Sequence, residues 1–139
     1  MGSDYSVGSR RRVTLSMQKD GTLTTGDDKV FTAPIPFTEG RLVGAIFAVQ
    51  ANGTSSGSTD FTIERHRAAV AADMLAAAAT VAFDSTVNFK EVIQSGLSAT
   101  VGNRILRFGD QVGLNIDAIP GGSDSVGASV ILIVHIDKD

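Results

Sequence analysis

The sequence predicts an all-β fold, an antiparallel β-sandwich or barrel of about eight short strands. The chain contains 15 Gly, 13 Ser and 12 Thr but one Tyr and no Trp, a composition typical of many turns. Apolar and polar residues alternate in several short runs, which Gly, Pro, Asn and Asp residues separate. The 139 residues have the length of one domain, and no rhythm of alternating strands and helices is visible.

The amino-terminal segment is predicted to be an extended arm, because its first eight residues offer little surface to bury. We place this arm at residues 1–12 and a single domain at residues 13–139. The first strand is expected over Arg12 to Gln18, where Val13, Leu15 and Met17 alternate with polar residues. Lys19 to Gly21 then predicts a turn.

The next segments predict an edge and a central strand. Val30 to Ala33 runs into Pro34 to Pro36, which cannot lie in a central ladder and therefore indicates an edge strand or a connection. Leu42 to Val49 is apolar at both alternating sets of positions, which indicates a strand that protein covers on both sides. This strand is expected in the core or at an interface between subunits.

Three further strands follow from alternation. Asn52 to Ser58 is rich in Gly, Ser and Thr and predicts a loop, and the alternating run Phe61 to His66 after it predicts a hairpin with the preceding strand. Val112 to Ala118 and Val130 to Val134 predict two more strands, separated by a Pro-Gly-Gly break.

The region between these strands is ambiguous. Ala68 to Ala79 contains many Ala residues with high helix propensity, but Leu75 to Phe83 also alternates with period two and shows no helical apolar face. We interpret Met74 to Phe83 as a strand. Val87 to Leu97 is compatible with a short helix or a turn, and Asn103 to Phe108 resumes the alternation.

Charge and composition exclude several functions. The net charge is −3 and the isoelectric point about 5.2, which argues against a nucleic-acid-binding protein. The absence of Cys excludes disulfides and thiolate chemistry. No apolar run is long enough to cross a membrane, and the first residues do not resemble a signal peptide, so synthesis in the cytoplasm is expected.

Charge is also distributed unevenly along the chain. Arg10, Arg11 and Arg12 against Asp4 give the first dozen residues a charge of +2, which leaves −5 for the remainder. A short basic run of this kind favours docking of the arm on an acidic protein surface over contact with nucleic acid.

No pattern predicts an enzyme, a metal site or a cofactor. Gly53 to Gly57 matches the Gly-x-Ser-x-Gly motif of hydrolases, but no helix is expected directly after it, so we interpret it as a loop. His66 and His135 lie on separate predicted strands without metal-binding spacing, and the Asp residues do not form a calcium-binding loop. The scarcity of Tyr and Trp also weakens a carbohydrate-binding role.

The order of these features resembles the small jelly-roll virion proteins of tailed bacteriophages, especially capsid decoration or cement proteins. The residues that carry the resemblance are Gly40 to Val49, the Gly53 to Gly57 loop and Phe61 to Arg65. In the second half they are Phe108 to Ile119, a strand entered through Gly-Asp, and the apolar strand Val130 to Ile136. The alanine-rich segment and the basic arm depart from the pattern.

This resemblance implies a jelly-roll sandwich without catalytic residues, which binds the major capsid protein on the capsid surface of the virion, often as a homotrimer. The alternatives are a sandwich from a phage tail, baseplate or fibre that binds a receptor or carbohydrate, and a separate carbohydrate-binding or hydrolytic domain. Arg10, Arg11 and Arg12 are the candidates for capsid docking. The candidates for the core or the subunit interface are Leu42, Val43, Ile46, Phe47, Val49, Val130, Leu132, Val134 and Ile136.

Overall fold

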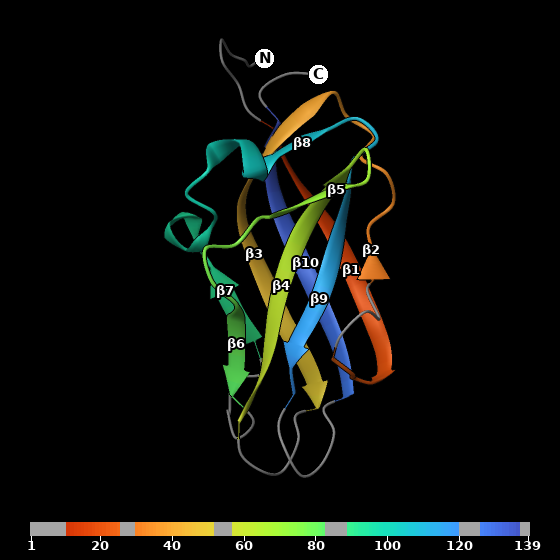
Figure 1. Cartoon of the computed structure of the whole chain (residues 1–139), viewed down its shortest axis with the longest axis vertical. Helices are drawn as coiled ribbons and strands as arrows, with labels where there is room; N and C mark the ends of the chain where they lie inside the picture. Colours follow the sequence, from red (N-terminus) through yellow and green to blue (C-terminus); the bar gives the residue numbers. More distant parts are fainter. Residues whose placement is uncertain (1–10, 26–29, 52–56, 83–88, 120–125, 137–139) are drawn as a thin grey trace.

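The computed structural model describes residues 11–25, 30–51, 57–82, 89–119 and 126–136. Two antiparallel sheets pack face to face in a β-sandwich (Figure 1). Sheet A contains β1 (Arg11–Thr22), β10 (Val126–Ile136), β3 (Glu39–Ala51), β7 (Phe89–Val92) and β8 (Ile105–Arg107). Sheet B contains β2 (Val30–Phe31), β9 (Gln111–Ala118), β4 (Ser58–Arg67), β5 (Val70–Asp73) and β6 (Ala79–Ala82). The 3₁₀ turns η1 (Gln94–Gly96) and η2 (Val101–Arg104) connect β7 to β8.

The strand order is that of a jelly roll. Sheet A runs β1-β10-β3 with β7 and β8 both paired to β3, and sheet B runs β2-β9-β4 with β5 and β6 both paired to β4. When β5 with β6 and β7 with β8 are each taken as one interrupted strand, eight strands remain in jelly-roll order. The predicted antiparallel sandwich is therefore confirmed, with two of its strands broken into pieces.

The core lies between the inner faces of the two sheets. In β4, buried residues alternate with half-buried ones from Thr59 to Ile63, as expected for a strand with one face on the core. Phe47 of β3 and Phe61 of β4 stack across the interior with ring centroids 5.5 Å apart. Both rings are fully buried, so the apolar residues of both sheets form one continuous core.

The turn predicted at Lys19 to Gly21 is wrong, because these residues lie inside β1. The pairing of β1 with β10 shifts between Lys19 and Thr22, where Gly21 adopts a positive φ of 78°. The turn-forming residues therefore produce a β-bulge within a long strand instead of a chain reversal.

The predicted hairpin around residues 53–57 is also wrong. Most of this loop lies outside the described residues, but the strands on its two sides belong to different sheets. β3 pairs with β10, β7 and β8, whereas β4 pairs with β9, β5 and β6. The connection therefore crosses from sheet A to sheet B, as jelly-roll connections do.

The strand predicted over Met74 to Phe83 is shorter in the structure. Only Ala79–Ala82 forms a strand, and Phe83 is outside the described residues. The N–H of Met74 still bonds to Ile63 of β4, while the carbonyl of Met74 and the N–H of Ala76 bond to the segment after β7. There Leu75 forms an isolated bridge with Leu97. The segment Val87 to Leu97, expected as a helix or turn, supplies β7 and then η1, and η2 replaces the start of the alternation expected from Asn103.

Candidate functional site

Every arginine in the described part of the chain lies toward one end of the sandwich, which we call the arginine end. β1 begins at Arg11, which pairs with Ile136 at the end of β10, and Arg41 pairs with both His135 and Ile105. Arg67, at the end of β4, donates a hydrogen bond to the carbonyl oxygen of Ile105. The arginine end comprises Arg11, Arg12, Arg41, Arg65, Arg67, Arg104 and Arg107.

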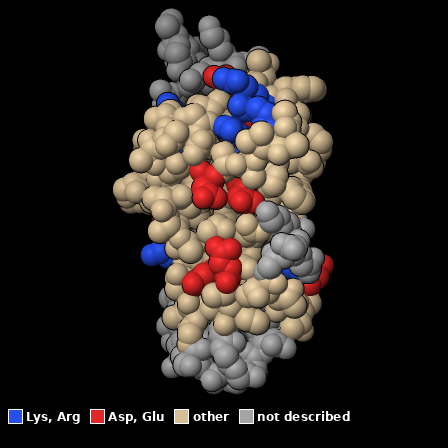
Figure 2. Space-filling view, in the orientation of Figure 1, with Lys and Arg blue, Asp and Glu red and all other residues tan. Residues whose placement is uncertain are grey.

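Charge therefore separates along the long axis of the molecule. On the face shown in Figure 2, basic side chains gather at the end where β5 and β8 lie, and acidic side chains gather over the middle of the face. In the ladder of sheet B, Glu64 of β4 is directly opposite Asp73 of β5. At the arginine end, Asp110 pairs with Arg67 and Glu39 pairs with Arg107.

The structure describes two of the three predicted docking residues. Arg11 and Arg12 are exposed and are the first two residues of β1, so the last two residues of the predicted arm belong to a strand. Arg10 lies outside the described residues. The other arginines at this end were not predicted, because they come from three separate segments, β3, β4 and the continuous η2–β8 segment, that only the fold brings together.

Asp110 organises the arginine end. This side chain is 3% exposed and accepts two hydrogen bonds from Arg67, from Nε at 2.9 Å and from Nη2 at 2.7 Å. It also accepts a hydrogen bond of 2.8 Å from the backbone N–H of Arg107. A bidentate ion pair of this kind fixes both partners in one geometry, so it clamps the end of β4 to the turn before β9.

The pKa values of this pair shift in opposite directions. Burial raises the pKa of Asp110, but the hydrogen bonds from Arg67 and from the backbone of Arg107 outweigh burial and leave the pKa below its ordinary value. The hydrogen bond to Asp110 raises the pKa of Arg67. Both groups are therefore held in their charged forms.

The outer face of sheet A forms a second candidate surface. Of the nine residues predicted for the core or a subunit interface, seven are buried inside this chain, namely Leu42, Phe47, Val49, Val130, Leu132, Val134 and Ile136. Val43 and Ile46 are half-buried instead. Ile46 pairs with Ile131, which is 41% exposed, and Ile133 follows on the same face of β10. Ile46, Ile131 and Ile133 form an apolar patch, which we call the isoleucine patch.

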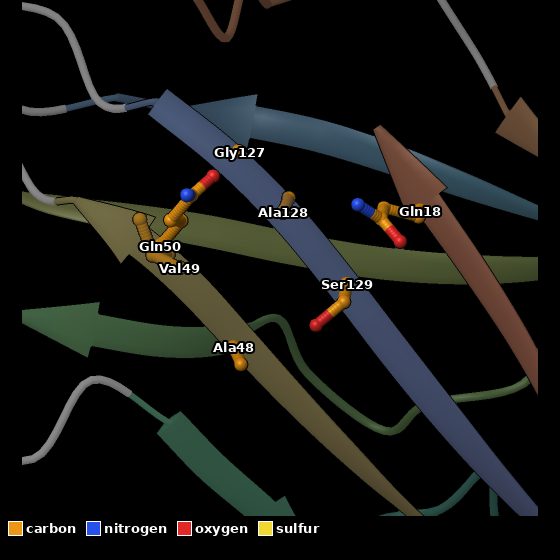
Figure 3. Close-up of a pocket in the computed structure, with 7 residues that line it drawn as sticks. All are labelled: Gln18, Ala48, Val49, Gln50, Gly127, Ala128 and Ser129. Atoms are coloured by element: carbon orange, nitrogen blue, oxygen red, sulfur yellow. The ribbon is translucent and has the colours of Figure 1, made fainter. Parts of the chain in front are cut away.

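A shallow groove lies beside the isoleucine patch on the same sheet. It has a volume of about 290 Å³, and Gln18 of β1 and Gln50 of β3 lie on either side of β10 (Figure 3). Small residues line its floor, among them Ser129 and Ala48, which pair across the two strands. Gly127 lies there too, and a Cβ atom added to it would lie 2.5 Å from Oε1 of Gln50. The groove therefore depends on Gly127.

We expect Gly127→Ala to lower the free energy of unfolding by about 1 to 2 kcal/mol. Gly127 has a φ of 69°, which L residues rarely adopt, and the added methyl group would displace Gln50. Gly102→Ala is the matched control, since nothing lies within 4 Å of its added Cβ atom. Urea unfolding measures both variants, and equal stabilities would contradict the expectation.

The structure shows no metal site in the residues it describes. No group of three His, Asp or Glu side chains there is arranged to hold a metal ion. His66 contacts Phe31 edge to face at 5.0 Å and lies 3.4 Å from Glu64, far along the chain from His135. Most of the Gly53 to Gly57 motif is outside the described residues. None of the described helical turns is long and apolar enough to cross a membrane.

Comparison with known proteins identifies the fold. No protein-family model matches the chain, and no curated protein matches it by sequence. Among solved structures, a chain of the cyanophage Pam1 capsid asymmetric unit matches with a TM-score of 0.57 and 17% identity, over 98% of this chain and 91% of that chain. A chain of the capsid of Ralstonia phage GP4 matches with a TM-score of 0.56 and 15% identity, over 89% and 83% of the two chains.

Proposed function

We propose that this protein is a non-enzymatic structural protein of a bacteriophage virion, which binds the outer surface of the capsid as a decoration or cement protein and bridges neighbouring capsomers. The observation that carries this proposal is the similarity in fold to chains from two phage capsids, which extends over nearly the whole of this chain. The two surfaces described above supply what such a protein needs, one for the capsid and one for other copies of itself.

The arginine end is the docking surface for the major capsid protein in this proposal. Arginine side chains form bidentate, charge-assisted hydrogen bonds with carboxylates and are therefore suited to an acidic protein surface. The exposed Arg11 and Arg12 lie at this end, directly after Arg10 and the rest of the amino-terminal segment.

The outer face of sheet A is the surface for self-association into a homotrimer. An apolar patch on a sheet that already covers its own core on the other face gains stability when a second copy removes it from water. Ile131 and Ile46 are adjacent at the centre of this face, where interface residues contribute most. The bridging role needs this association, because several linked copies contact several capsomers at once.

We expect the double variant Arg11→Gln, Arg12→Gln to bind capsids about tenfold more weakly than the unmodified protein, since each exposed ion pair contributes up to about 1 kcal/mol. Cosedimentation with capsids of the parent phage that lack this protein measures the affinity. Lys90→Gln is the matched control, because it removes one exposed positive charge outside the arginine end.

Two results would contradict the proposal. Equal binding by the double variant and the control would exclude docking through the arginine end. Labelling of the protein on the tail of intact virions, with none on the head, would instead support a tail or fibre component. Electron cryo-microscopy of the virion distinguishes the two locations.

A further inference from the structure

Phe108 is the most exposed large apolar side chain among the described residues, and it lies at the arginine end. It is 75% exposed and directly follows Arg107, in the turn that joins β8 to β9. The N–H of Asp110 donates a hydrogen bond of 2.9 Å to the carbonyl oxygen of Arg107 and closes this turn. Single apolar residues are common on protein surfaces, so the neighbours of Phe108 decide whether it marks a contact.

The turn between β4 and β5 lies beside the turn that carries Phe108. β4 and β9 are antiparallel neighbours, and His66 near the end of β4 pairs with Gln111 at the start of β9. Arg67, the next residue of β4, binds Asp110, the residue just before β9, through Nε at 2.9 Å and Nη2 at 2.7 Å. This ion pair joins the two turns, so both project from the same end of the sandwich (Figure 1).

The turn between β4 and β5 has a strained backbone. Arg67 pairs with Val70, which leaves Ala68 and Ala69 as a two-residue loop. Their φ angles are 49° and 66°, and among the described residues they are the non-glycine residues with a positive φ. A loop of this geometry favours Asn-Gly, because the Cβ atom of most L residues causes strain there. Such strain persists where neighbouring contacts hold it, and it is concentrated at functional sites.

The apolar surface of the two turns is bordered by positive charge. Ala68 and Ala69 are exposed, and each turn is directly preceded by an arginine, Arg67 or Arg107. Aromatic and arginine side chains are both enriched in the interfaces between proteins. This surface therefore fits a partner protein that offers an apolar depression with carboxylates around it.

We propose that Phe108, together with Ala68 and Ala69, is the apolar anchor of the arginine end and inserts into an apolar depression bordered by acidic side chains on the major capsid protein. This inference rests on the proposed function and deepens it, because exposed ion pairs alone are weak and screened by salt. The ion pair between Arg67 and Asp110 holds both turns in place before binding. Little conformational freedom is then lost when the anchor is buried.

Phe108→Ala tests the anchor directly. We expect this variant to bind capsids of the parent phage that lack this protein at least about tenfold more weakly than the unmodified protein, because burial of a phenyl ring stabilises a complex by that factor or more. Its Tm is expected to be nearly unchanged, since the ring is already exposed. Ile93→Ala is the matched control, because Ile93 is 62% exposed and lies just after β7, outside the arginine end.

Cosedimentation at low and at high salt separates the apolar contact from the ionic ones. We expect the loss of affinity caused by Phe108→Ala to be the same at both salt concentrations. The loss caused by Arg11→Gln, Arg12→Gln is expected to shrink at high salt, because salt screens exposed charges.

The strained turn is tested by the double variant Ala68→Asn, Ala69→Gly. We expect its Tm to rise by about 5 °C, because Asn-Gly relieves the strain. Its affinity for capsids is expected to fall about threefold or more, because the loop loses apolar contact surface. A more stable variant that binds capsids as tightly as the unmodified protein would exclude this turn from the anchor.

Equal binding by Phe108→Ala and Ile93→Ala would overturn the inference and leave the proposed function intact. If the unmodified protein does not bind capsids, the proposed function fails and the inference fails with it. Flotation with vesicles of phosphatidylcholine and phosphatidylglycerol tests a membrane as the partner. Binding of the unmodified protein to these vesicles that Phe108→Ala abolishes would also overturn the inference.

Discussion

Asp110→Asn is expected to lower the free energy of unfolding by about 2 to 3 kcal/mol. The substitution leaves the guanidinium of Arg67 beside a neutral amide. In one orientation its N–H₂ group faces the Nε of Arg67, and in the other it faces both the Nη2 of Arg67 and the N–H of Arg107, in place of an accepting oxygen. The loss is smaller than for a fully buried ion pair, because the side chain of Arg67 is 31% exposed and gains solvation when the pair breaks. Urea unfolding measures the difference.

Glu39→Gln is the matched control for this prediction. Glu39 also pairs with an arginine at the same end, but both side chains are more than half exposed, so we expect a change of less than about 0.5 kcal/mol. If both variants lowered the free energy of unfolding equally, burial of Asp110 would not explain why its ion pair stabilises the protein.

The same pair determines how stability depends on pH. Because the pKa of Asp110 in the folded protein is below its ordinary value, its contribution is complete above about pH 4 and decreases as the pH falls through the lower, folded value. Asp110→Asn removes the titrating group, so stability is expected to decline less steeply in acid. Parallel acid declines for the variant and the unmodified protein would contradict this origin of the pH dependence.

The sequence predicted strands correctly wherever apolar and polar residues alternate along a short run. The runs around Phe61, Val112 and Val130 form strands with the expected faces, because one side of each strand is buried against a continuous core. Their pairing was not predictable. A strand followed by a Gly-rich loop and another strand fits a hairpin and a crossover between sheets equally well, and only the packing of both sheets selects the crossover.

The bulge at Gly21 and the break after Met74 have a similar explanation. Lys19-Asp20-Gly21 has the composition of a turn, but the long partner strand β10 keeps β1 in its ladder as far as Thr22. Met74 is fully buried although its neighbours have high helix propensity, so tertiary packing overrides local preference in this segment. Both outcomes are set by contacts with other strands and not by the residues of the segment itself.

The candidate surfaces were only partly predictable, and for a physical reason. The apolar residues of β3 and β10 were identified as a group, but alternation alone does not say which side of a strand faces its own core. The arginine end was recognisable only in its first members, since Arg41, Arg65 and Arg104 come from segments distant in sequence. These segments meet through the pairing of β3 with β8 and the contact of β4 with η2.

Ile131→Asp is expected to weaken self-association by at least about 100-fold, because a carboxylate at the centre of an apolar interface loses its hydration without gaining a partner. Ile131 pairs with Ile46 on one side and Ser16 on the other, so no basic side chain lies directly opposite it in the ladder. Sedimentation equilibrium measures the oligomer, and the unmodified protein is expected to form a trimer.

Val70→Asp is the control, because it places the same charge on an apolar residue that is 61% exposed at the edge of sheet B. This variant is expected to remain a trimer. Since Ile131 is already 41% exposed in the single chain, Ile131→Asp should yield a folded monomer with nearly unchanged stability. If Ile131→Asp still forms a trimer, the isoleucine patch is not the subunit interface. If it forms a folded monomer, the outer face of these strands serves assembly while their inner face serves the core.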